Sequence, residues 1–213
     1  MTVRSKIKSY IVNLDDYEVV QEINRCEFAC IYLIKNKINH HILAAKVQMS
    51  SMSSDYSGPP RSLLELCVLM RIQVPTIIRF YGFSTTDFQG NSNPTILMEY
   101  KENGSLNKFI ELQQNGESPS EYDNTAKQII LCGIAHGMMT LHSHHVIHFD
   151  LKPANVLLDS NLFPCITDFG LSDKENKEHK SERGTPVYMA PEVYEGTNST
   201  SKADVYSFGI LMY

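Results

Sequence analysis

Residues 148–155 read H-F-D-L-K-P-A-N, and this stretch decides how the rest of the chain is interpreted. The apolar run V-L-L follows it at 156–158, the triplet D-F-G stands at 168–170, and A-P-E stands at 190–192. Each of these groups alone is weak, because Asp, Asn and Pro are common in ordinary turns. Their joint occurrence in this order and spacing is difficult to obtain by chance, so we interpret them as parts of one site.

After residue 102 the chain is predicted to be mainly helical. A short helix is expected at 106–110, and apolar residues recur at helical spacing over residues 126–141. Ser120 and Asp123 precede this longer helix with the spacing of a capping box, in which Ser120 would be the N-cap. The remaining expected elements are short strands at 155–158 and 165–167, a turn at 159–163 and a surface loop at 173–183.

Residues 17–100 predict a small antiparallel sheet with one helix. Short runs rich in Val, Ile, Leu and Tyr alternate with polar turn clusters, which is typical of strands. Apolar residues at helical spacing over 63–72, followed by Pro75, predict an amphipathic helix of about three turns. A sheet-rich first half and a helical second half indicate an α+β chain. The strands are expected at 17–23, 29–35, 42–49, 79–85 and 95–100.

The three groups together resemble the signature of the protein kinase family, and the resemblance runs over residues 17–213. It implies an α+β, two-lobed protein-kinase-like fold behind an N-terminal extension at 1–16. The small β-rich N-lobe would occupy 17–101 and the mainly helical C-lobe 102–213. Because the sequence stops inside an apolar segment where the family continues, we expect the C-lobe to be truncated.

The resemblance implies phosphoryl transfer from ATP, with Mg²⁺, to Ser or Thr side chains of protein substrates. Asp150 would orient the acceptor hydroxyl, and Lys152 would neutralise charge on the transferred group. Asn155 and Asp168 would hold Mg²⁺ through oxygen atoms, which that hard ion prefers. Thr185 would bridge to Asp150 and Lys152.

Nucleotide-binding roles also follow from the resemblance. Lys46 resembles the strand lysine that pairs with the α and β phosphates, and Glu65 would be its helix partner. Met98 resembles the gatekeeper at the back of the pocket, and Asp204 the residue that anchors the catalytic loop. The complete set with nucleotide-binding roles is Ile23, Asn24, Cys26, Ile31, Ala44, Lys46, Glu65, Met98, Glu99, Lys101 and Leu157.

Two segments indicate the branch of the family. The stretch 184–192, G-T-P-V-Y-M-A-P-E, resembles serine/threonine-directed kinases. Glu99 and Tyr100 in the presumed hinge at 96–104, together with N-G-S-L at 103–106, are closer to the tyrosine-kinase-like branch. That branch mostly phosphorylates Ser and Thr, so the two observations agree.

Two substitutions depart from the family pattern. The loop that covers the phosphates should carry three glycines, but residues 24–31 read N-R-C-E-F-A-C-I. Glycine lets a backbone approach phosphates closely, whereas Cys26 places a side chain there. Phe149 stands where the family usually has an arginine before the catalytic aspartate. A phosphate on the loop 169–189 would therefore lack the arginine that normally binds it. The departures and the truncation leave two alternatives open: a pseudokinase scaffold, or an inert kinase fragment.

Composition restricts the classes of binding partner and the cellular compartment that we expect for this chain. The net charge of −5, from 19 basic and 24 acidic residues, argues against nucleic acid as a general partner. No apolar run reaches the roughly 18 residues of a membrane span. The five cysteines are scattered without a C-x-x-C pair, which predicts a reducing, cytoplasmic location. Four histidines within 142–148 could suggest a metal site, but their spacing runs from a helix into a loop, and the family match explains His148.

Overall fold

The structure is a computed structural model that describes residues 7–26, 28–49, 61–175, 183–197 and 199–213. The chain divides into two compact units. The first comprises Met1–Ser62 and Arg79–Tyr100, and the second comprises Leu63–Ile78 and Lys101–Tyr213. This division groups 63–78 with the helical unit, whereas the predicted N-lobe of 17–101 contains them, so the lobe boundaries stay a prediction.

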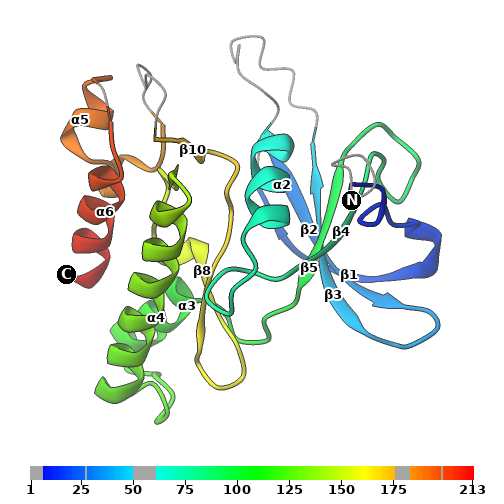
Figure 1. The fold of residues 1–213 in the computed structure, drawn as a ribbon. Coiled ribbons are helices and arrows are strands. Elements are labelled where there is room, and N and C mark those ends of the chain that lie inside the picture. The colour runs from blue at the N-terminus through cyan, green and yellow to red at the C-terminus, as the bar shows by residue number, and fades with distance from the viewer. Residues whose placement is uncertain (1–6, 27, 50–60, 176–182, 198) are drawn as a thin grey trace. The chain divides into compact units, whose positions relative to one another are not determined.

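The first unit is built on a five-stranded sheet in the order β1-β2-β3-β5-β4, with every neighbouring pair antiparallel (Figure 1). A short 3₁₀ helix, η1 at Leu14–Asp16, leads into β1. Each strand agrees with a predicted one to within two residues at either end. The strands are β1 Tyr17–Arg25, β2 Ala29–Asn36, β3 Ile42–Gln48, β4 Phe80–Ser84 and β5 Thr95–Glu99.

One face of this sheet carries the hydrophobic core of the unit. Leu43 and Ala45 on β3 lie on that face, since successive side chains in a strand point to opposite sides. Ala44 and Lys46 therefore lie on the other face, where the residues predicted to bind nucleotide gather. The buried core cluster is Leu14, Ile34, Leu43, Ala45 and Leu97.

The second unit is mainly helical, which together with the sheet confirms the predicted α+β class. Its small strand pairs are local: β7 pairs with β10, and β6, β8 and β9 form a three-stranded sheet. The helices are α2 Arg61–Arg71, α3 Leu106–Gln114, α4 Asn124–Ser143, α5 Pro191–Tyr194 and α6 Lys202–Met212. The short elements are β6 Gly104–Ser105, β7 Val146–Ile147, η2 Pro153–Asn155, β8 Val156–Leu158, β9 Pro164–Ile166, β10 Asp173–Lys174 and η3 Pro186–Tyr188.

The long helix α4 begins later than the capping-box pattern predicts. Asp123 is the N-cap, and its Oδ1 accepts a hydrogen bond from the backbone N–H of Ala126 at 2.8 Å. The assignment of Ser120 as the cap was therefore wrong, because Asp123 is an equally good capping residue placed three positions closer to the helix. Farther along, Gly133 and Gly137 let α4 pack tightly: a Cβ on Gly133 would lie 2.4 Å from Pro164 Cγ.

Candidate active site

The predicted catalytic loop, residues 148–155 between β7 and β8, is held by a buried carboxylate. Asp204, on α6, accepts the backbone N–H of His148 at Oδ2 and that of Phe149 at Oδ1, both at 2.9 Å. Its Oδ2 also lies 2.8 Å from Nε2 of His142 on α4. Phe149 has a φ of +66°, a left-handed conformation that strains a residue with a side chain. Asp204 thus fixes a strained backbone immediately before Asp150, the role that the family resemblance implies.

His148 ties the two predicted catalytic segments together. Its fully buried ring accepts the backbone N–H of Asp150 at Nδ1, at 3.2 Å. Nε2 lies 3.1 Å from the carbonyl oxygen of Thr167, which can only accept, so Nε2 carries the proton. The ring also packs against Phe169, with centroids 5.2 Å apart. One imidazole therefore contacts residues on either side of Asp168, which itself has a φ of +64°.

The side chain of Asp150 is surrounded by donors. Oδ1 accepts the hydroxyl of Thr185 at 2.7 Å, and Oδ2 accepts Nδ2 of Asn155 at 2.9 Å. The ammonium of Lys152 lies 2.9 Å from Oδ2 and 2.6 Å from Thr185 Oγ1. A carboxylate has about four lone-pair sites, two on each oxygen. Within the described part of the chain, these three donors leave one site, on Oδ1, for an incoming hydroxyl.

Asn155 is oriented so that its oxygen is the atom left for a cation. Its two amide hydrogens go to Asp150, one to the carbonyl oxygen at 2.8 Å and one to Oδ2. Its backbone carbonyl accepts the N–H of Thr167 at 3.0 Å, next to Asp168. The predicted metal ligands are thus an amide oxygen and a carboxylate on hydrogen-bonded segments. This donor set fits Mg²⁺.

Five of the predicted nucleotide residues of the first unit share the face of the sheet opposite its core. Asn24 on β1 pairs with Ile31 on β2, and Ile31 pairs with Lys46 on β3. Ala44 on β3 pairs with Met98 on β5, in the next row of the same face. Lys46, Ala44 and Met98 are buried. Register alone therefore brings these five residues together.

The segment that replaces the glycine-rich loop is an ordinary hairpin end. Arg25 pairs with Cys30 in register, and the N–H of Cys26 donates to the carbonyl of Ala29 at 2.9 Å. Nε of Arg25 donates to Glu22 Oε1 at 2.8 Å, and this hydrogen bond lowers the pKa of Glu22. Ile23 lies at a register irregularity between its two neighbours in β1 and is partly exposed.

The other predicted nucleotide residues lie at separate places. Glu65 is fully buried on α2 in the second unit, and its pairing with Lys46 stays a prediction. Glu99 ends β5, where its N–H donates to the carbonyl of Arg79. Lys101 directs its ammonium to Asp159, 4.0 Å away, so a role in nucleotide binding would fall to its backbone. Half-buried Leu157 pairs with Cys165 across β8 and β9.

Sequence reasoning missed two residues of this site. His142 was considered only within the histidine run, although it holds Asp204. Gly184 has a φ of +108°, and a Cβ there would lie 2.3 Å from the carbonyl oxygen of Phe149. The one available signal was the position of this glycine directly before Thr185.

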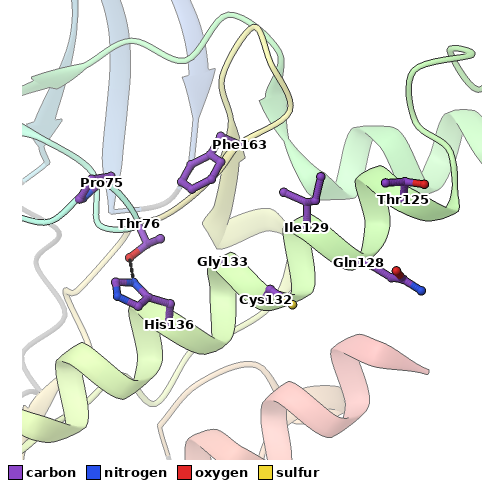
Figure 2. Close-up of a pocket in the computed structure, with 9 residues that line it drawn as sticks. All are labelled: Pro75, Thr76, Thr125, Gln128, Ile129, Cys132, Gly133, His136 and Phe163. Atoms are coloured by element: carbon purple, nitrogen blue, oxygen red, sulfur yellow. Dashed lines mark hydrogen bonds between the residues drawn. The ribbon is translucent and has the colours of Figure 1, made fainter.

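A hollow of about 580 Å³ lies between α4 and the segments that carry Thr76 and Phe163 (Figure 2). Ile129, Cys132 and His136 line it from the helix, and Phe163 and Thr76 line it from the opposite side. His136 Nδ1 lies 3.1 Å from the hydroxyl of Thr76. None of the residues predicted for chemistry lines this hollow, so the candidate site remains the catalytic loop.

Comparison with known proteins agrees with this geometry. Residues 17–213 match the family model described as the protein kinase domain. The chain belongs to the protein kinase family. For a kinase domain, ATP and a divalent metal ion are the general co-reactants, and protein side chains are the general acceptors. In the described residues of this kinase domain, no helix is both long and apolar enough to cross a bilayer.

Similar proteins come from several groups of kinases. The kinase domain is 34% identical to Cold-responsive protein kinase 1 of Arabidopsis thaliana over 205 residues, covering 93% of this chain and 50% of that protein. It is 34% identical to the probable LRR receptor-like serine/threonine-protein kinase RFK1 of Arabidopsis thaliana, covering 93% of this chain and 19% of that protein. Identity to serine/threonine-protein kinase PLK4 of Drosophila virilis is 28%, over 97% of this chain and 26% of that protein. The chain thus spans half or less of these relatives, and the tyrosine-kinase-like branch stays a prediction.

Proposed function

We propose that the chain transfers the γ-phosphoryl group of ATP to Ser or Thr hydroxyls of protein substrates. The observation that carries this proposal is the set of donors around Asp150, in which Thr185, Asn155 and Lys152 leave one lone-pair site on Oδ1. The names of the relatives, which include several serine/threonine-protein kinases, support the acceptor class. The net charge of −5 favours a protein over a nucleic acid substrate.

Each residue has a defined part in the transfer. Asp150 accepts the hydrogen bond of the acceptor hydroxyl at Oδ1 and takes its proton as the new O–P bond forms. The bond between the γ-phosphorus and the bridging oxygen breaks, and ADP leaves. Lys152, held 2.9 Å from Asp150, supplies positive charge next to the transferred group. Mg²⁺ bound through Asn155 and Asp168 would neutralise charge on the phosphates.

The enzyme and the scaffold alternatives differ in one measurement. The full chain is incubated with ATP labelled at the γ position and with peptides that carry a single Ser, Thr or Tyr. We expect label on the Ser and Thr peptides with Mg²⁺ and none with excess chelator. Nucleotide binding without transfer to any peptide would overturn the proposal and leave the scaffold. Transfer to the Tyr peptide alone would overturn the acceptor class.

A cytoplasmic location stays a prediction from the cysteine pattern.

A further inference from the structure

An arginine beside the catalytic loop has no part in the proposed transfer. The guanidinium carbon of Arg183 lies 5.0 Å from the centroid of the Phe149 ring. Its Nη1 lies 3.5 Å from Oδ2 of Asp173, and the side chains of Arg183 and Asp173 are only 20% and 16% exposed. A cation over an aromatic face is attracted by the ring, and more strongly where water is excluded. Arg183 is therefore held from two sides in a largely buried setting.

Residues 183–185 contact residues 149–150 one after another. Arg183 lies over the ring of Phe149, Gly184 fits against the carbonyl of Phe149, and Thr185 donates to Asp150. At Gly184 an added Cβ would clash with that carbonyl oxygen, so the backbone of residue 184 lies directly against the backbone of residue 149. Fixing Arg183 therefore fixes Thr185 two residues later.

Asp173 is attached to the same loop from its other end. It belongs to β10, where it pairs with Ile147 of β7, just before His148 and Phe149. The ion pair between Asp173 and Arg183 thus joins two segments that both rest on residues 146–150. The negative charge that Arg183 meets comes from a carboxylate of the chain itself.

We propose that Arg183 is a positioning residue for phosphoryl transfer. Through Phe149 and Asp173 it holds Thr185 on Asp150 and Lys152, so that this arrangement needs no phosphorylated side chain. The inference rests on the proposed function, because the position of Thr185 affects turnover only if Asp150 acts on the acceptor hydroxyl.

The experiment is a double-mutant cycle on the full chain with Arg183→Gln, Phe149→Leu and the pair together. Each single variant should lower kcat about five- to tenfold, as expected for losing one desolvated cation–π contact. The KM for ATP should change little, since Thr185 hydrogen-bonds Asp150 and contacts Lys152, to which the proposal gives roles in the transfer step rather than in nucleotide binding. The double variant should lose no more than the worse single variant. Arg183→Lys, which keeps the charge next to Asp173, should recover part of the rate.

A matched control removes the same kind of contact elsewhere. Arg79 lies 5.3 Å over the ring of Tyr81 in the first unit, and Arg79→Gln should leave kcat unchanged. Additive losses in the cycle, or an equal loss in the control, would overturn the proposal. So would coupling that is seen in urea unfolding midpoints but not in kcat, because it would show a purely structural contact.

A wild-type chain without any transfer would count against the proposed function instead. Because no kcat could then be compared, the unfolding midpoints of the same four proteins would test only whether Arg183 holds the loop through Phe149. Coupled midpoints would show that it does, and additive midpoints would overturn the proposal.

Discussion

The catalytic loop and the end of the β1–β2 hairpin are built in opposite ways. Hydrogen bonds of the loop join residues far apart in sequence, such as Phe149 with Asp204, 55 positions away, and Asp150 with Thr185, 35 positions away. At the hairpin end the side-chain hydrogen bonds of Arg25 are exposed, and two of them go to Glu22, three positions away. The loop also contains a strained residue, Phe149, whereas Arg25 lies in regular strand register. The difference shows that the geometry around Asp150 is fixed by several distant segments, whereas the segment predicted to cover the nucleotide depends on contacts within and next to its own hairpin.

The largest expected effect is at the centre of the loop. Asp150→Asn keeps the shape of the side chain but cannot take the proton of the acceptor, so kcat should fall on the order of 10²- to 10⁴-fold. Initial rates with labelled ATP measure it. Asp123→Asn is the matched control, because Asn caps helix α4 as well as Asp does and should leave the rate unchanged. If Asp150→Asn and the wild type had equal kcat values, Asp150 would have no part in the transfer.

A second test of the loop uses its tightest backbone contact. Gly184→Ala would strain a φ of +108° and push a Cβ against the carbonyl of Phe149, so Thr185 should leave Asp150. A shift of about 1 Å there should cost roughly 100-fold in kcat. Gly116→Ala is the control: its φ is +75°, but no atom lies within 4 Å of the new Cβ. Similar turnover in both variants would show that strain alone, not the contact with Phe149, matters.

The hairpin should respond in affinity rather than in rate. Asn24→Gly combined with Cys26→Gly restores backbone freedom where the phosphates are expected. One recovered N–H bond to a charged group, about 1.5–3 kcal/mol, should lower the KM for ATP on the order of 10- to 100-fold. The kcat should stay within a few-fold, because Asp150 and Lys152 are untouched. A change in kcat without a change in KM would contradict the assignment of nucleotide affinity to the hairpin end and of the transfer step to the loop around Asp150.

The smallest effect is expected from phosphatase treatment. Phe149 has no donor for a phosphate, and Arg183 already pairs with Asp173. The kcat values of the treated and untreated full chain should therefore agree within about twofold. The reason is that position 149 has no arginine to form charge-assisted hydrogen bonds with a loop phosphate. Phosphate content measured by mass spectrometry provides the control. A large drop in turnover after dephosphorylation would contradict the inference that Asp173, rather than a phosphate, holds Arg183 in place.

The same contrast explains what could be predicted from the sequence. The strands and the amphipathic helix were predictable, because alternation and helical spacing are local patterns. That Asp150 and Asn155 lie together was predictable through their fixed spacing, while the roles of Asp150, Asn155 and Asp168 stay predictions. The cap of α4 was misplaced because Ser120 and Asp123 are both good caps and only the fold selects one. The contacts of Arg183 and His142 had no signal, since nothing in the local pattern indicates a partner dozens of residues away.

The anchoring of the loop by Asp204 also has a consequence for synthesis. The carboxylate that holds His148 lies 56 residues later in the chain. At typical translation speeds of 5–20 residues per second, the ribosome needs about 3 to 11 s to make that stretch. During this interval Asp150 is already synthesised but its loop lacks the group that fixes it. Until α6 is made, a nascent chain therefore lacks the carboxylate that accepts the backbone N–H groups of His148 and Phe149, so we expect the loop to take its final conformation only after residue 204 has been added.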